Sequence, residues 1–140
     1  MNKFSHESLS PELIHLLGHD ERTPAHTHAL GHLVYPATGV LSLVTRDGSW
    51  IAPSNRVVWV PAEFEHQHRA HGATDMRVVF LPESMATSLV PHPAVLATTP
   101  LAREAMLALT EPRRREKAST DRLRLVVIDE IGRASCRERV

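Results

Sequence analysis

The chain has 140 residues, which is enough for one compact domain with a real core and too few for two ordinary domains. Its 16 basic and 16 acidic residues cancel, so a general electrostatic attraction to nucleic acid or to a membrane surface is excluded. No apolar run approaches the roughly 20 residues of a membrane span, and residues 1–11 lack the apolar stretch of a signal peptide. We therefore expect a soluble, cytoplasmic protein. Its single cysteine, Cys136, excludes an internal disulfide.

Residues 12–98 are predicted to form an all-β barrel. A first apolar run, 12–17, stops at Gly18 as a strand would. Short apolar or alternating runs then follow, separated by turns rich in Gly, Pro, Asn and Asp, and Asp47-Gly48 between two such runs is a strong hairpin signal. Many short strands at this spacing favour a sandwich or barrel. The expected strands are 26–35, 40–45, 49–52, 56–60, 66–70, 76–81 and 95–98.

Residues 99–131 change to helical periodicity. Thr99 is suited to cap a helix whose first turn holds Pro100 and which Pro112 ends. A second helix is expected to begin after Thr120 or Asp121. Its one apolar stripe must cover either its own barrel or a second subunit, and the pattern favours neither. Apolar residues at helical spacing are Leu101, Ala105, Met106 and Leu109 in the first helix, and Leu123, Val126, Val127 and Ile131 in the second.

Residues 132–140 continue neither pattern. We interpret them as a non-native tail and leave them out of the fold prediction.

Ten histidines are unusual in a chain of this length and indicate a chemically functional site. On an extended strand His26 and His28 share a face, and His32 joins them if no bulge intervenes at Gly31. His66 and His68 share a face in the same way, after a turn containing Pro61. Imidazoles that converge inside a barrel make an all-nitrogen site, which suits Zn, Fe(II), Ni or Cu rather than Mg or Ca.

Two spacings resemble the cupin motifs. The pattern His26-x-His28-x3-His32-x6-Gly39 matches the first, with His32 where Glu or Gln is usual. Pro61-x4-His66 matches the second, although Glu63 replaces the usual Gly and Ala70 the usual Asn.

The surrounding sequence is similar to the N-terminal cupin of AraC-type transcriptional regulators. The similarity covers roughly residues 12–131 and is carried by residues 32–41 (HLVYPATGVL), 57–62 (VVWVPA), 99–104 (TPLARE) and 122–130 (RLRLVVIDE). It implies a cupin barrel, that is a double-stranded β-helix or jelly roll, followed by two short helices that make a dimer contact. In that family a helix-turn-helix domain normally follows, and this chain lacks it, so contact with DNA is expected only through a domain that is not present here.

The resemblance implies a metal site on His26, His28 and His66, with His32 as the fourth candidate ligand. His32 equally fits a hydrogen-bonding neighbour of the metal ligands, and His68 fits the cavity wall better than a ligand position. Tyr35, Trp50 and Trp59 are candidates for stacking on an organic ligand in the cavity, although core or rim packing is the commoner role of such residues.

Two functions follow as hypotheses. The first is an effector-sensing and dimerisation domain of an AraC-type regulator. It would bind a small molecule, a transition metal (Zn, Ni or Fe) or both, form a homodimer through its C-terminal helix, and catalyse no reaction. The alternative is a standalone metal-dependent cupin enzyme of the dioxygenase or isomerase type. Against that alternative, the third motif position holds no carboxylate, and Glu63 and Glu65 lie in a predicted turn, so no general base stands out.

Overall fold

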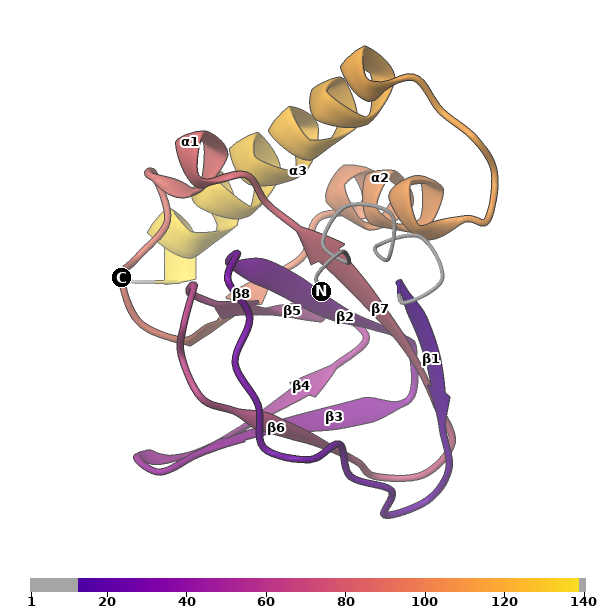
Figure 1. The fold of residues 1–140 in the computed structure, drawn as a ribbon, viewed down its shortest axis with the longest axis vertical. Coiled ribbons are helices and arrows are strands. Elements are labelled where there is room, and N and C mark those ends of the chain that lie inside the picture. Colours follow the sequence, from indigo (N-terminus) through magenta and orange to yellow (C-terminus); the bar gives the residue numbers. More distant parts are fainter. Residues whose placement is uncertain (1–12, 139–140) are drawn as a thin grey trace.

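The computed structural model describes the backbone of residues 13–138 and the side chains of residues 13–131. This part of the chain has eight strands and three helices: seven strands come first, and α1, β8, α2 and α3 follow (Figure 1). The strands are β1 (Ile14–Leu17), β2 (His32–Thr38), β3 (Val40–Thr45), β4 (Gly48–Pro53), β5 (Arg56–Val60), β6 (Gln67–Ala70), β7 (Thr74–Phe80) and β8 (Ala94–Ala97). The helices are α1 (Glu83–Ala86), α2 (Pro100–Thr110) and α3 (Lys117–Glu138).

The strands form two facing sheets. One has five strands in the order β1-β7-β2-β5-β8 and the other three in the order β4-β3-β6, and all their pairings are antiparallel. The hairpin predicted at Asp47-Gly48 joins β3 to β4, and Gly39 turns the chain from β2 into β3 with a φ of +93°. These two sheets, followed by helices, confirm the fold class predicted from the sequence.

The five-stranded sheet is buried on both faces, since alternate side chains point to opposite sides of a strand. Val34, Val58 and Val60 lie between the two sheets with Leu41 and Leu43 of the smaller sheet. The residues next to them in sequence face the helices. This second core contains Leu33, Tyr35, Val57 and Trp59 from the sheet with Met106, Val127 and Ile131 from α2 and α3. The sheet therefore separates an inner cavity side from a helix side.

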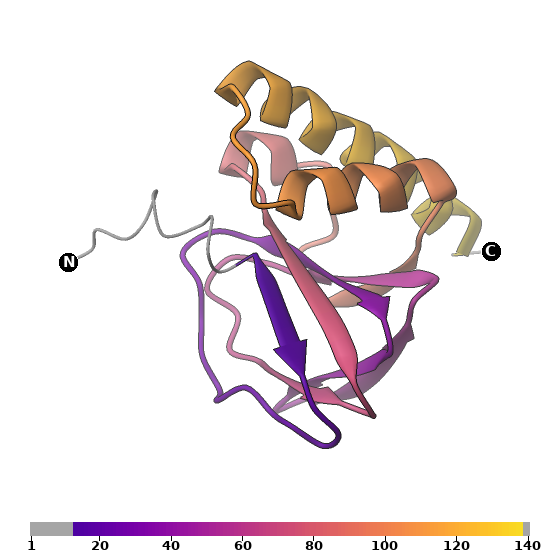
Figure 2. The same ribbon diagram turned by 90° about the vertical axis from the view of Figure 1, so that its right-hand side faces the viewer.

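All three helices lie on the same side of the barrel (Figure 2). The predicted cap is confirmed, because Thr99 Oγ1 accepts a hydrogen bond from the Ala102 amide at 3.1 Å and Pro100 occupies the first turn of α2. Val127 and Ile131 of α3 are fully buried within this chain, so the apolar stripe of the last helix covers its own barrel. Within the described residues, no helix combines the length and the apolar character that a membrane crossing requires.

The structure corrects four of the sequence predictions. Residues 26–31 are not part of a strand, because His26 makes only an isolated bridge to His66 and residues 27–31 cross from one sheet to the other before β2 begins at His32. The short helix α1 was not predicted, and α3 begins at Lys117 rather than after Thr120. Leu101 was expected in the apolar stripe of α2 but is 57% exposed. The predicted tail lies outside the described side chains, although the helical backbone of α3 continues to Glu138.

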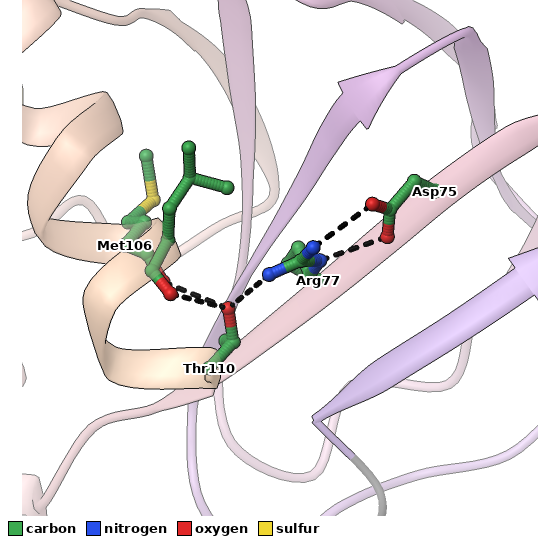
Figure 3. Close-up of polar contacts among 5 residues, drawn as sticks. Asp75, Arg77, Met106 and Thr110 are labelled. Carbon is green, nitrogen blue, oxygen red and sulfur yellow. Dashed lines mark hydrogen bonds and ion pairs between the residues drawn. The ribbon is translucent and has the colours of Figure 1, made fainter. Parts of the chain in front are cut away.

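One partly buried polar network fastens α2 to the barrel (Figure 3). The Arg77 guanidinium on β7 donates two hydrogen bonds to Asp75, at 2.8 and 2.9 Å, and a third to Thr110 Oγ1 at 2.9 Å. The Thr110 hydroxyl in turn donates to the backbone carbonyl of Met106 at 3.0 Å. Because Thr110 is 1% exposed, water cannot replace these contacts.

We expect Thr110→Val to destabilise the protein by about 1 to 2 kcal/mol, because the isosteric side chain leaves one Arg77 N–H unpaired in a half-buried position. Urea unfolding followed by tryptophan fluorescence measures the change. Thr87→Val on the exposed end of α1 is the matched control and should leave the unfolding midpoint unchanged. Equal midpoints for Thr110→Val and the wild type would show that the network does not fasten α2.

Candidate metal and effector site

The two histidine segments meet because residues 20–26 run antiparallel along β6. His26 and His66 exchange two backbone hydrogen bonds, each of 2.9 Å. Thr23 and Ala70 extend the pairing further along the strand, through bonds to His68 and to Glu21 respectively. Residues that pair directly across an antiparallel ladder point to the same face. The imidazoles of His26 and His66 therefore lie side by side, with ring centroids 4.3 Å apart.

His28 and His32 join this pair from the crossing segment and from the start of β2. The Glu63 amide donates to the His28 carbonyl at 2.7 Å, which holds the segment against the turn before His66. His32 pairs across the sheet with Val60 and with Phe80, on the face that points between the sheets. The His32 ring centroid lies 4.5 Å from that of His28 and 5.0 Å from that of His66. His68, two residues beyond His66, completes the cluster at 5.2 Å from His66.

The ligand atoms fall into two groups of three. The outer triad is His26, His28 and His66, and the inner triad is His32, His66 and His68. Within each triad one nitrogen per residue lies within 4.8 Å of the others. His26 and His28 are partly exposed, whereas all members of the inner triad are buried. The structure thus brings together the four predicted metal ligands and adds His68.

Backbone contacts fix how two of these rings present their nitrogens. Nδ1 of His26 faces the Pro24 carbonyl, and Nδ1 of His66 lies 2.9 Å from the Phe64 carbonyl. A carbonyl can only accept, so in both rings Nδ1 carries the hydrogen and Nε2 keeps the lone pair. This is the orientation that metal-ligating histidines usually have.

Several of the remaining nitrogens are buried without a protein partner: both of His32, Nε2 of His66 and Nδ1 of His68. Each unsatisfied buried polar atom costs about 1 to 3 kcal/mol. A bound transition metal ion would accept one lone pair from each neutral imidazole and so lower that cost. The donor set therefore fits a divalent metal that prefers nitrogen, such as Zn, Ni, Fe or Co.

The cluster keeps its imidazoles neutral, as ligation requires. Burial, reinforced by neighbouring imidazoles, lowers the pKa of His68 to about 3 and that of His28 to about 4. Burial also lowers the pKa of His66, and it lowers the pKa of His32 well below its usual value, against a weak opposing contact with the Leu30 backbone. The site can therefore ligate a metal at neutral pH without first releasing protons from these four residues.

Four histidines of the cluster, His26, His28, His32 and His68, line a cavity of about 360 Å³ together with His15, and His66 is not among its lining residues. Its remaining wall is largely apolar, with Met76, Val78 and Phe80 on one side and Thr23 and Pro24 at the rim. Neither Lys, Arg, Asp nor Glu is among the described residues that line it. An anionic ligand therefore has no fixed cationic side chain to pair with, and no carboxylate stands ready as a general base. Glu63 and Glu65 are exposed and lie outside the lining.

The aromatic residues predicted to line this cavity lie elsewhere. Tyr35 is fully buried on the helix side of β2, where its hydroxyl donates to the Ser54 carbonyl at 2.7 Å. Trp59 also faces the helix side and lines a separate cavity of about 460 Å³ beside α1. Tyr35 is three residues from His32, so strand alternation places the two side chains on opposite faces. Trp50 packs on the edge of the inner core and is not among the lining residues.

Sequence reasoning missed the apolar wall and His15. Met76, Val78 and Phe80 are spaced two apart on β7, so they share the inner face. The Phe80 ring packs against His28 and His32, with centroid distances of 5.3 and 5.4 Å. That alternation is visible in the sequence. The position of His15 at the cavity follows only from the pairing of β1 with β7.

Comparison with known proteins gives the fold but no close relative. No family model matches the sequence, and no curated protein matches it either. The structure is similar to that of ToxT from Vibrio cholerae, with a TM-score of 0.62, 8% identity, and coverage of 89% of this chain and 55% of that one. ToxT bound to (E)-4-(8-methylnaphthalen-1-yl)but-3-enoic acid gives a TM-score of 0.64 at 8% identity, covering 89% and 56%. A cupin-2 domain protein from Shewanella frigidimarina has 17% identity over 50% of this chain and 67% of that one, with a TM-score of 0.43.

This chain thus spans about half the length of the ToxT chains that it matches. At 8% identity the match to ToxT shows a shared fold and nothing more. The function has to be argued from the site.

Acid should destabilise the metal-free protein. The fold keeps His28 and His68 neutral, whereas the unfolded chain protonates them near pH 6.5, so below that pH the unfolded state binds more protons. Stability is then complete above pH 6.5 and falls as the pH drops toward the folded-state values of about 4 and about 3. For His68 alone the loss at pH 4.5 is on the order of 2 kcal/mol.

Urea unfolding with a chelator at pH 7.5, 5.5 and 4.5 measures this loss. His68→Leu should flatten the dependence, and His92→Asn, at an exposed position, should not. This window stays above the range in which the ion-paired Asp20 and Asp121 titrate, because the pKa of each lies below 3.8. A wild-type protein with constant stability from pH 7.5 to 4.5 would contradict the neutral cluster.

Proposed function

We propose that this chain is the effector-sensing and dimerisation domain of an AraC-type transcriptional regulator, and that its cavity binds a transition metal together with a small molecule. The observation that carries the proposal is the buried histidine cluster, which opens onto a cavity lined otherwise by apolar side chains. The fold of ToxT, an AraC-family regulator, over 89% of the chain supports it. DNA contact would belong to a domain that follows the helices.

The metal and the effector would have separate roles. The residues of the outer and inner triads would hold the metal, which would supply a positive charge in a cavity whose described lining includes no cationic side chain. Met76, Val78 and Phe80 contact the apolar part of the effector. We therefore propose an effector that is either neutral or an anion able to coordinate the metal. ToxT has been solved with an unsaturated fatty acid, which belongs to the second class.

A direct contact links the cavity to the last helix. Phe80 packs its ring on His28 and His32, and its backbone carbonyl accepts a hydrogen bond from Nε of Arg124 on α3 at 2.9 Å. Arg124 is also held by Asp121, at 3.3 Å. A change at the histidines that moves Phe80 must therefore move or break a contact of α3. This is the path by which occupancy would bias whatever follows the helix.

Metal binding is the first test of the site. We expect one Co²⁺ or Zn²⁺ per chain at pH 7.5, measured by calorimetry. His66→Ala should weaken the affinity about 100-fold or more, because His66 belongs to both triads. His92→Ala, on the surface, is the control and should bind as the wild type does. If the wild-type protein takes up no metal, the metal part of the proposal is wrong and only the small-molecule effector remains.

Hydrogen exchange tests the regulatory coupling. Co²⁺ should slow amide exchange in α3 of the wild type, because it fixes Phe80 and with it the contact to Arg124. In Arg124→Met the metal should still bind, and α3 should no longer respond. Arg122→Met on the exposed face of the same helix is the matched control and should respond like the wild type. Slowed exchange at the histidines with none in α3 of the wild type would argue for an isolated binding site.

The dimer contact, if α3 makes it, must use the face left exposed after Val127 and Ile131 are buried. Leu125 is 52% exposed on that face, one turn from exposed Arg122 and Asp129. We expect Leu125→Glu to shift the sedimentation equilibrium toward monomer, with Leu101→Glu on α2 as the control of similar exposure. The opposite ranking of the two variants would place the contact on α2.

The standalone enzyme remains the second candidate because the outer triad is partly exposed, which leaves room for a substrate at the metal. The absence of a carboxylate from the described lining residues weighs against it. Oxygen consumption by Fe(II)-loaded protein that is lost in His26→Ala would favour this reading over the regulator.

A further inference from the structure

The inner triad has the properties of a metal position in its own right. His32, His66 and His68 are 1, 1 and 2% exposed, and each has at least one buried ring nitrogen without a protein partner. One nitrogen from each residue of this triad lies within 4.8 Å of the other two, a limit that the outer triad also meets. A cation bound between these three residues would accept one lone pair from each imidazole and so satisfy nitrogens that no protein group contacts.

His68 is held in place by its backbone. Its amide donates to Thr23 Oγ1 and its carbonyl accepts from the Thr23 amide, both at 2.9 Å, while β3 pairs with it at Leu43 on the other side. His68 and His66 are two apart on one edge and share the inner face. The imidazole therefore points into the cavity, which it helps to line, rather than toward solvent.

The two triads can serve only one ion at a time. His66 belongs to both, and its Nδ1 is engaged by the Phe64 carbonyl, so Nε2 is its single available ligand atom. We infer that His68 is a metal ligand and that the cavity holds one divalent transition metal ion with two positions. The inner position uses His32, His66 and His68, and the outer one uses His26, His28 and His66. This inference rests on the proposed metal-binding function.

The two positions differ in what else can reach the ion. In the inner position all three ligands are buried, so the ion is held by protein alone. In the outer position His26 and His28 are partly exposed while His66 is buried, so an ion there would be reachable from the cavity rim beside Thr23 and Pro24, where a small molecule could coordinate it. A coordinating effector would therefore favour the outer position over the inner one.

The test removes the outer position and asks whether metal still binds. We expect the His26→Ala/His28→Ala double variant of the full chain to bind one Co²⁺, seen as a d–d absorption spectrum distinct from that of the wild type. In that background His68→Gln should weaken Co²⁺ binding about tenfold or more. His92→Gln is the control, because His92 is exposed, lies outside the cavity and belongs to neither triad.

His68→Leu distinguishes loss of a metal ligand from loss of the fold, since it places an apolar side chain of similar volume in a buried position. It should melt at or above the temperature of the metal-free double variant and still lose Co²⁺. A double variant that binds no Co²⁺ while the wild type does would overturn the inner position and leave metal binding itself intact. Two Co²⁺ ions per wild-type chain would overturn the inference that the two positions share His66 and hold one ion between them. No Co²⁺ in the wild type would overturn this inference and the metal part of the proposed function together.

Discussion

The pair of backbone hydrogen bonds between His26 and His66 is the interaction on which the candidate site depends. It aligns residues 20–26 with β6, and this register places two segments forty residues apart on a common face. A shift of one residue would turn one set of imidazoles away from the other, because side chains alternate along an extended chain. The close approach of five histidine rings is therefore a consequence of backbone pairing. No attraction between the rings is needed to explain it.

The same pairing creates a cost that a ligand can remove. Four of these imidazoles have pKa values lowered by burial, and several of their nitrogens lack a protein partner. A barrel interior filled with aliphatic side chains would be more stable in the metal-free state. Imidazoles arranged in this way fit a site kept for binding, with the orientation of His26 and His66 fixed in advance by the carbonyls of Pro24 and Phe64.

The five-stranded sheet connects this site to the helices. One face carries His32 and Phe80, and the other carries Tyr35 and Trp59 beneath α2 and α3. Two polar contacts join the helices to the strand that bears Phe80: Arg124 bonds to the Phe80 carbonyl, and Arg77 bonds to Thr110 at the end of α2. The sheet is a single layer between the histidine cavity and the helices. A displacement of β7 on the cavity side would therefore also displace its contacts with α2 and α3.

Local signals in the sequence determined the strands, the hairpin at Asp47-Gly48, the cap at Thr99 and the four histidines of the motif spacing, because each depends on neighbours within a few residues. They also contained the alternation that separates Tyr35 from His32. The crossing of residues 27–31 between sheets, the start of α3 and the place of α1 were decided by tertiary contacts. Tertiary contacts also decided the position of His68, because its pairing partners Thr23 and Leu43 are distant in the chain. Periodicity reports which residues share a face of one element, and only the packing of elements decides what that face meets.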